Sequence, residues 1–446
     1  MFLRKKVTEY RWRNWSGRLS AVPARYELPA SEEALATLLR ETSGLVRVAG
    51  AGHSFTPIAV SEALLISLDR LSGVIDHDAD AMRATVWGGT KIHALGSALH
   101  TRGLALLNQG DIDRQSVSGA VSTGTHGTGA TLGSLSSAVA GARLVLADGS
   151  TLDCDTARNP DVLDAVRVSL GALGIITRLT LQCRAPYGLR ERGQVMAVED
   201  IFRNLDRLRD GARHFEFWWF PYADAAICKF LEEGEAPRPR RSAEEMSRGG
   251  TMDEEQRLFQ QLNELTRAVP VLAAPINRAI TAAAAKGMTK AGNENRSLRL
   301  SYEAFPSPRL VRFNEMEFAV SARNGADCAR EIVAMVRKRR IATAFPIEFR
   351  YVKADMGWLS PFYERDSVTI SVHQYAKMDP KPLFGPCEDI FRTYEGRPHW
   401  GKMHSHGPAD FARLYPKWNE FLALRERLDP NGRFLNSYLG GVLARA

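Results

Sequence analysis

The sequence predicts an α+β protein with more than one domain. Its 446 residues exceed what one hydrophobic core usually organises, so two or three lobes are expected. Helical patterns and short β-rich runs alternate over roughly the first 185 residues, with glycine-rich connections between them. Beyond that point the composition shifts to longer, aromatic-rich strand patterns. A content of 44% hydrophobic and 25% charged residues is ordinary for a globular enzyme.

The first part of the chain offers clear local signals. A helix is predicted over residues 31–44, because Ser31 can cap it and leucines share one face. A second helix is predicted over residues 91–103, with Gly103 placed to end it. Asp148-Gly149 predicts the turn of a β-hairpin within residues 142–155. Further short strands are predicted in the runs 45–50, 63–68, 73–77 and 83–89.

The second part is predicted to be a group of strands flanked by helices. The strand patterns are "HFEFWWFPY", "RFNEMEFAV", "FPIEFRYV" and "SVTISVHQY". A helix is expected over residues 268–287, packed against its own domain, with attachment to a membrane surface as the alternative. A single helix-like segment, residues 411–430, precedes the C-terminus. No internal repeat is visible.

Charge and cysteine content narrow the classes of partner. The net charge of +8 is compatible with nucleic acid, an anionic membrane face or a phosphate-bearing ligand, but a solvated basic surface is favoured. The basic run at residues 238–242 lacks the interleaved aromatic residues of a nucleic-acid site. Five scattered cysteines without CxxC spacing indicate neither a disulfide framework nor a zinc site. We therefore expect a cytoplasmic protein without secretory signal or membrane span, with peripheral membrane association left open.

Two glycine-rich stretches indicate a phosphate-bearing ligand. They are "GAGHSF", residues 50–55, and "SVSGAVSTGTHGTG", residues 116–129. Neither is a dinucleotide fingerprint, since Phe55 occupies the third glycine position, and neither is a P-loop. Small residues with free backbone N–H groups can nevertheless wrap a pyrophosphate. The alternative is two ordinary loops, which is less favoured because both carry a histidine.

Five segments together resemble one flavoprotein family. "RVAGAGHSF", "LNQGDIDRQSVSGAVSTGTHGTG", "SLGALGIITRLTL", "IEFRYV" and "RPHWGKMH" occur in the order seen in the aldonolactone oxidoreductase branch of the vanillyl-alcohol-oxidase family. The resemblance spans nearly the whole chain and is weakest between about residues 190 and 310. It implies a two-part FAD-binding domain of the vanillyl-alcohol-oxidase/PCMH type (residues 1–186) and an antiparallel-sheet cap domain for substrate (187–395). A C-terminal segment (396–446) would return to the first domain.

The resemblance assigns the cofactor residues. His53 stands where relatives bond a histidine covalently to the 8α-methyl of FAD, whereas the loop motif alone would suggest only a hydrogen-bonded histidine. Covalent attachment needs a neutral imidazole beside the flavin, and glycines let the backbone approach the ring. The implied FAD-lining residues are Val48, Ala49, Gly50, Ala51, Gly52, His53, Ser54, Ser116, Gly119, Thr123, Gly124, Thr125, His126, Ile175, Ile176 and His399.

Substrate residues follow from the cap strands and from the resemblance. Alternation places Glu348 and Arg350 on one strand face, a pattern that by itself most often means a salt bridge on a wet sheet. The family positions imply that Glu348, Arg350, His373 and Lys402 bind the substrate and act in catalysis. Gly110 matches a small gatekeeper residue for oxygen beside the flavin. Asp111 replaces a serine that contacts substrate in alditol oxidases, which favours a lactone.

The expected reaction is oxidation of a sugar lactone of the L-gulono- or D-arabinono-1,4-lactone type. The C2 hydroxyl would lose its proton to Lys402 or His373 while hydride passes to flavin N5, giving an ascorbate-type product. Dioxygen would reoxidise the flavin and form hydrogen peroxide. The alternatives are an alditol oxidase acting on a polyol such as xylitol or sorbitol, and a lactone dehydrogenase with another acceptor.

Two different classes of protein are disfavoured. A metal enzyme would use the cluster His399, His404 and His406, but no carboxylate stands at facial-triad spacing, so we expect no metal. A nucleic-acid-binding protein would rest on charge alone, and no such partner is expected.

Overall fold

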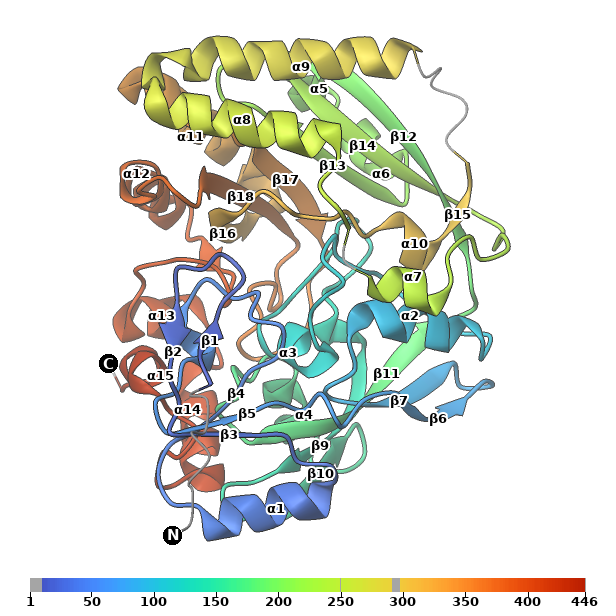
Figure 1. Cartoon of the computed structure of the whole chain (residues 1–446), viewed down its shortest axis with the longest axis vertical. Coiled ribbons are helices and arrows are strands. Elements are labelled where there is room, and N and C mark those ends of the chain that lie inside the picture. The colour runs from blue at the N-terminus through green and yellow to red at the C-terminus, as the bar shows by residue number, and fades with distance from the viewer. Residues whose placement is uncertain (1–9, 249, 291–296, 446) are drawn as a thin grey trace, which may run out of the picture.

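The computed structural model describes residues 10–248, 250–290 and 297–445. The basic start of the chain, residues 1–9, lies outside this description. Figure 1 shows two lobes, one above the other, here called the lower and the upper storey. The lower one holds the N-terminal half together with the C-terminal helices, and the upper one holds a large sheet with helices on both sides. The α+β class expected from the sequence is confirmed.

Three small sheets build the lower storey. The six-stranded sheet has the order β10-β9-β11-β7-β6, with β8 pairing β11. Its strands are β6 (Val74–Asp78), β7 (Arg83–Trp87), β8 (Ala105–Leu106), β9 (Val139–Val145), β10 (Thr151–Asp155) and β11 (Ile175–Arg184). A parallel sheet joins β3 (Arg25–Glu27), β5 (Leu64–Ile66) and β4 (Val46–Val48). The strands β1 (Trp12–Arg13) and β2 (Ser20–Ala21) form a separate pair.

The predicted N-terminal helices and hairpin are confirmed. Helix α1 (Glu32–Glu41) begins after Ser31, whose hydroxyl accepts a hydrogen bond from the Ala34 amide at 3.1 Å. Helix α2 (Ile92–His100) follows at the expected place. The β9–β10 hairpin turns at Gly149, whose φ of +81° requires glycine. The lower storey also contains α3 (Val117–Ser122) and α4 (Pro160–Val166).

An eight-stranded sheet, here called the cap sheet, forms the upper storey. Its order is β15-β12-β14-β13-β17-β18-β16-β19. The strands are β12 (Gly188–Ala197), β13 (His214–Trp219), β14 (Ala225–Gly234), β15 (Arg299–Leu300), β16 (Phe313–Ser321), β17 (Ile347–Val352), β18 (Ser367–Tyr375) and β19 (Arg397–Pro398). All its paired strands are antiparallel.

The two faces of the cap sheet differ in chemistry because successive side chains alternate. One face is apolar and packs under helices α5 (Val198–Arg203), α6 (Leu205–Asp210), α11 (Gly325–Arg339) and α12 (Lys381–Thr393). Its core contains Phe217, Phe349, Ile370 and Phe318. The residues between these are polar, and they face the lower storey. This polar face is where the cavity described below is found.

The remaining upper helices are α7 (Ala243–Ser247), α8 (Glu254–Ala268), α9 (Ala273–Lys290) and α10 (Ser301–Ala304). The helix expected over residues 268–287 is thus α9, which starts after the short turn Pro270–Leu272. It packs on β12 and β14, as expected for a helix that belongs to its own domain. Within the described chain, we find no helix with both the length and the apolar character needed to cross a membrane.

The C-terminal segment differs from its prediction. Instead of one helix, α13 (Pro408–Leu414) and α14 (Trp418–Leu428) are separated at Tyr415–Lys417, because Pro416 has no amide hydrogen to continue a helix. Their aromatic side chains join the core of the lower storey. After α14, the Val46 amide donates to the carbonyl of Arg433 at 2.8 Å, so the chain end adds to the edge of β4. Helix α15 (Ser437–Val442) follows.

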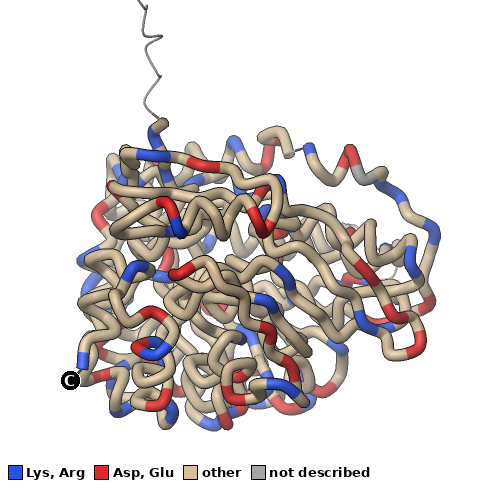
Figure 2. The backbone as a smooth tube through the Cα atoms, turned by 90° about the horizontal axis from the view of Figure 1, so that it is seen from below, with Lys and Arg blue, Asp and Glu red and all other residues tan. Residues whose placement is uncertain are grey.

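Charged positions of both signs are interspersed over the side of the molecule seen in Figure 2. Basic positions are therefore not gathered into one patch of the backbone on this side. Several of the acidic positions are buried instead, and these gather at the polar face of the cap sheet.

Candidate active site

The two glycine-rich loops meet in the lower storey. The first follows β4, and the second leads into α3 through Ser116. Gly50 lies so close to Ser116 that a Cβ atom on Gly50 would sit 2.4 Å from the serine Oγ. Gly52 has a φ of +71°, a conformation that favours glycine. Glycine is therefore needed in the first loop for close approach and for backbone shape.

The first loop presents free donors. Among the residues that the structure describes, none of the five backbone amides from Gly50 to Ser54 donates to another protein group. Consecutive free amides form a concavity that binds anions such as a diphosphate. The cavity above them, here called the loop cavity, is lined by both glycine loops and by Ile175, Ile176, Arg47 and Phe434. Its chemistry fits an elongated ligand that carries phosphate.

Most of the predicted FAD residues line this space. Those in the loop cavity are Val48, Gly50, Ala51, Gly52, His53, Ser54, Ser116, Gly119, Thr123, Ile175 and Ile176. Thr125, His126 and His399 line the adjoining cavity instead. Ala49 and Gly124 line neither: Ala49 is buried with its amide bonded to Ile66, and Gly124 packs on Pro361. Arg47, Gln115 and Phe434 line the loop cavity and carried no sequence signal.

His53 lies where two cavities join. It lines the loop cavity and also a second cavity, here called the cap cavity, together with Ser54, Gln115 and Thr123. Its ring stacks on Trp15 with 5.8 Å between centroids. Burial and the nearby cations Lys402 and Arg114 lower the pKa of His53 to about 4. The imidazole is therefore neutral at physiological pH, with one nitrogen lone pair available for bonding.

The cap cavity is covered by the polar face of the cap sheet. Strand register sets Trp218, Glu348, Ser371 and Glu317 opposite one another in a single row across β13, β17, β18 and β16. A neighbouring row brings Glu216 next to Arg350, and His373 pairs with Glu315. The predicted residues Glu348, Arg350, His373, Lys402, Gly110 and Asp111 all line this cavity. The structure thus brings together residues that are far apart in sequence.

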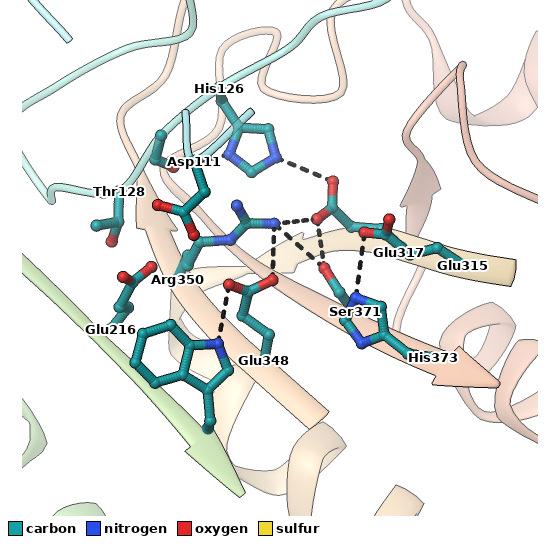
Figure 3. A network of polar contacts seen from close by, with 12 residues as sticks. Asp111, His126, Thr128, Glu216, Glu315, Glu317, Glu348, Arg350, Ser371 and His373 are labelled. Carbon is teal, nitrogen blue, oxygen red and sulfur yellow. Dashed lines mark hydrogen bonds and ion pairs between the residues drawn. The ribbon is translucent and has the colours of Figure 1, made fainter. Parts of the chain in front are cut away.

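Arg350 is the centre of this polar face (Figure 3). One of its terminal nitrogens, Nη2, donates to Glu317 at 2.5 Å and Ser371 at 3.2 Å, and lies 3.4 Å from Glu348. Arg350 is only 9% exposed and Glu348 only 4%, so their contact is not a salt bridge on a wet surface. The Nε of Arg350 has no partner among the described residues. A ligand oxygen can supply that missing acceptor.

Lys402 and His373 form a second charged group in the cavity. The Lys402 ammonium contacts the Glu315 carboxylate, and His373 Nε2 lies 3.6 Å from the other oxygen of Glu315. Burial opposes ionisation of Glu315, but Lys402 and His373 hold its pKa well below the usual range. The Nδ1–H of His373 donates to the Pro346 carbonyl at 3.2 Å. The Nε2 side of the His373 ring faces Glu315.

A cluster of carboxylates closes the other end of the cavity. Asp111, Glu216 and Glu348 bring one oxygen each within 4.8 Å of one another. Cations satisfy this cluster: Asp111 pairs with Arg309 at 3.1 Å, and Glu216 with Lys229 at 3.1 Å. Burial, reinforced by the neighbouring carboxylates, raises the pKa of Glu216 to about 7, although Lys229 opposes the shift. An arginine and a lysine thus neutralise part of the charge of this cluster.

The histidines considered as metal ligands have separate roles. His399 lines the cap cavity, and its Nδ1 accepts a hydrogen bond from the Gly401 amide at 3.0 Å. His404 bonds Tyr438 at 2.9 Å, while His406 bonds Glu388 at 2.8 Å. Each ring is directed to its own partner rather than to a common point.

Sequence reasoning missed several residues of the cavity. These are Glu315, Glu317 and the ion pair of Glu216 with Lys229 beside the cavity, together with Arg309, which lines it as Glu315 and Glu317 do. The first three alternate with apolar residues in "RFNEMEFAV" and "HFEFWWFPY", two segments already predicted as strands. Acidic residues at period two in a strand whose other face is apolar were therefore an available signal. Lys229 and Arg309 had no such pattern.

Comparison with known proteins identifies the family. The D-arabinono-1,4-lactone oxidase family matches residues 179–442, and an FAD-binding domain matches residues 23–155. A relative named L-gulono-1,4-lactone dehydrogenase, from Mycobacterium tuberculosis, is 38% identical over 97% of this chain and 99% of its own length. The chain belongs to the D-arabinono-1,4-lactone oxidase family. As a member, it is an FAD-binding oxidoreductase.

Two further relatives of this family member have other names. The L-gulonolactone oxidase of Mus musculus is 30% identical, covering 97% of this chain and 98% of that one. An alditol oxidase of Streptomyces is 29% identical over 96% of this chain and 98% of its own. A solved cholesterol oxidase from B. sterolicum has a TM-score of 0.81 at 17% identity, covering 98% of this chain and 97% of that one. That likeness shows the shared fold.

The residues present fit FAD. Free amides and a close approach between glycine and serine suit the diphosphate, and the loop cavity opens at His53 into the charged cap cavity. A flavin ring held at this junction would lie between the glycine loops and the charged residues of the cap sheet.

Proposed function

We propose that this protein oxidises the C2 hydroxyl of a sugar 1,4-lactone of the L-gulono- or D-arabinono type. The observation that carries the proposal is the cap cavity, in which Glu348, Arg350, His373 and Lys402 surround a space that His53 joins to the loop cavity. Hydroxyl-rich lactones need several fixed donors and acceptors, and this cavity supplies both. FAD supplies a hydride acceptor next to it.

Each side chain has a role that its contacts support. Arg350 keeps donors free for a substrate oxygen or for negative charge that develops during reaction, which is most effective where water is excluded. Glu348 is fixed to accept from a substrate hydroxyl. His373 is favoured as the base, because the Pro346 carbonyl holds its ring at Nδ1 and its Nε2 lies beside Glu315 in the cap cavity. Lys402 contacts Glu315 and is better suited to orient the hydroxyl oxygen.

We further propose that FAD is bonded covalently through His53. The support is the position of His53 at the junction of the cavities and its neutral imidazole. For reoxidation we propose dioxygen, with hydrogen peroxide as product, because Gly110 leaves the wall of the cap cavity without a side chain. A lactone dehydrogenase using another acceptor is the second candidate, supported by the name of the 38% identical relative.

An alditol oxidase is the remaining alternative within the family. Asp111 argues for the lactone, because its carboxylate is engaged by Arg309 and Lys229. A carboxylate held in this way offers the substrate an acceptor and a nearby cation, whereas a serine hydroxyl would offer one small polar group. This arrangement would favour a ligand with a carbonyl oxygen as well as hydroxyls.

The experiment is anaerobic bleaching of the flavin with a panel of L-gulono-1,4-lactone, D-arabinono-1,4-lactone, xylitol and sorbitol. We expect the lactones to reduce the flavin faster than either alditol. Faster bleaching by xylitol or sorbitol would reassign the protein as an alditol oxidase. A flavin that dithionite reduces but none of the four sugars bleaches would overturn the proposal.

A further inference from the structure

Glu317 occupies a central place in the cap cavity and was given no role by the sequence. It is 1% exposed and lies on β16 between Met316 and Phe318, which face the apolar core. Its carboxylate receives hydrogen bonds from Arg350, Ser371 and His126. Two of these donors belong to the cap sheet, and His126 belongs to the second glycine loop. Glu317 therefore links the cap sheet to the cofactor loops.

Both ring nitrogens of His126 contact a hydrogen-bond partner. Its Nδ1 lies 2.8 Å from the carbonyl of Gly127, and its Nε2 lies 2.9 Å from Glu317. A carbonyl oxygen only accepts, so Nδ1 carries a proton. Burial opposes ionisation of Glu317, but His126 and Arg350 lower its pKa well below the usual range, so its carboxylate also accepts. His126 is consequently held at both ring nitrogens, by its own loop on one side and by Glu317 on the other.

Glu317 also determines how Arg350 is presented. It takes the Nη2 nitrogen of Arg350, the same nitrogen that contacts Ser371 and Glu348. All three contacts hold one corner of the guanidinium. Figure 3 shows the other terminal nitrogen directed away from Glu317. Without Glu317 the guanidinium would keep only the weaker contacts and could turn.

We propose that Glu317 is a positioning residue, which His126 anchors to the cofactor loop and which holds Arg350 in the orientation that serves the flavin and the substrate. The proposal rests on the proposed function and adds a residue to it. A displacement of about 1 Å in a reacting group commonly lowers the rate about a hundredfold. Holding Arg350 in place can therefore outweigh the unfavourable free energy of burying the Glu317 carboxylate.

The competing explanation is that Glu317 only neutralises buried cations. The two explanations make opposite forecasts for sulfite, which adds to oxidised flavin and leaves a negative charge that a nearby cation stabilises. If Glu317 acts only through its charge, Glu317→Gln makes the site more positive and tightens sulfite binding. If Glu317 positions Arg350, the same substitution misplaces the guanidinium and weakens sulfite binding.

The experiment is a double-mutant cycle of Glu317→Gln and Arg350→Ala in the FAD-loaded enzyme. The readouts are the sulfite dissociation constant and the rate of flavin reduction by lactone. We expect Glu317→Gln alone to weaken sulfite binding and slow reduction by at least about tenfold each. In the Arg350→Ala background the same change should alter either quantity by less than about twofold, because its effect passes through Arg350.

The chain offers a matched control in Glu388. This buried carboxylate also bonds a histidine and lies near an arginine, His406 at 2.8 Å and Arg392 at 3.6 Å, but it lines neither cavity. Glu388→Gln should change the melting temperature and leave sulfite binding at the wild-type value. If Glu317→Gln protein cannot be loaded with FAD, Ser371→Ala tests the same group of contacts. It removes a hydroxyl that bonds both Glu317 and Arg350 and so helps to hold the two side chains together.

The outcomes are separable from those of the proposed function. Sulfite binding needs no substrate, so the cycle decides the role of Glu317 even if no lactone reduces the flavin. Tighter sulfite binding in Glu317→Gln, or equal effects in both backgrounds, would overturn the positioning role. For Ser371→Ala, wild-type sulfite binding would do the same.

Discussion

The indole Nε1–H of Trp218 donates a hydrogen bond of 3.1 Å to Oε1 of Glu348, its partner on the neighbouring strand. The second oxygen of Glu348 lies 3.4 Å from Arg350 Nη2. Each oxygen of this buried carboxylate is thus held by a different residue, Trp218 on β13 and Arg350 on β17 itself. Glu348 enters a reaction with its orientation already set, and little reorganisation is needed.

Glu348→Gln should slow flavin reduction by lactone about a hundredfold. The glutamine keeps an oxygen for Trp218 but loses the negative charge that a substrate hydroxyl and Arg350 face. Folding and FAD content should stay near wild type. Stopped-flow reduction under anaerobic conditions measures the rate. Glu264→Gln is the control, because Glu264 makes its ion pair with the exposed Lys377 away from the cavity. Reduction of Glu348→Gln at the wild-type rate would remove Glu348 from the reaction.

Acid-precipitated wild-type protein should remain yellow, and its intact mass should exceed the apoprotein mass by one FAD. The reason is the neutral imidazole of His53 at the junction of the two cavities. His53→Ala should release its FAD on precipitation, because no side-chain nitrogen remains at that position to hold it covalently. A colourless pellet from fully loaded wild-type enzyme would disprove the bond.

Gly50→Ala should lose most of its FAD, and Ser116→Gly should restore it in the double variant. The alanine methyl would lie 2.4 Å from Ser116 Oγ and 3.3 Å from its Cβ, and glycine at position 116 removes both atoms. Overpacking of this kind commonly costs 1–3 kcal/mol, to be seen as a lower melting temperature of the apoprotein. FAD absorbance after gel filtration measures retention. Equal FAD loss in the single and double variants would show that the loops fail for another reason.

Reduced wild-type enzyme should react with dioxygen faster than it turns over, and should form hydrogen peroxide. Gly110→Ala should slow both flavin reduction and reoxidation. Its methyl would lie 2.9 Å from the His126 carbonyl and displace the backbone of His126, whose side chain bonds Glu317. Gly440→Ala, a helical position with open space, is the control. Reoxidation that is slow with oxygen but fast with an artificial dye would favour the dehydrogenase.

The apoprotein should lose stability as the pH falls below about 6.5. Burial lowers the pKa of His214 to about 3. Below about pH 6.5 this histidine is therefore protonated in the unfolded chain but stays neutral in the folded one. By pH 4 this difference lowers the free energy of unfolding by about 3 kcal/mol. His399 and His404 shift in the same direction. His214→Asn keeps a donor for Thr128 but cannot be protonated, so its stability should fall less steeply. Urea unfolding at pH 7 and pH 4.5 measures both slopes, and parallel slopes would contradict this account.

Local patterns were sufficient for most elements of the fold. Ser31 capped a helix where expected, and Asp148-Gly149 turned a hairpin, because these signals depend only on neighbours in sequence. The cap strands were found from their alternating residues. The helix break at Pro416 was missed, because the apolar spacing on both sides of the proline continued as if in one helix.

The site was harder to foresee because it depends on strand order. That Glu348 and Arg350 share a strand face follows from their spacing alone. Strands β16 and β17 both pair with β18, and no local pattern specifies this order. The order places Glu317 opposite Ser371 and Ser371 opposite Glu348. The contact of His126 with Glu317 joins residues 191 positions apart. Such contacts are fixed by tertiary packing, which a single sequence does not reveal.

The place of Phe434 bears on how far the chain can be shortened. Phe434 lines the loop cavity, and its carbonyl accepts from Arg47, a residue 387 positions earlier. The wall of the loop cavity is therefore complete only in a chain that extends at least to residue 434. A protein truncated before that residue should lack this part of the wall and bind FAD more weakly, even where the cap sheet has formed.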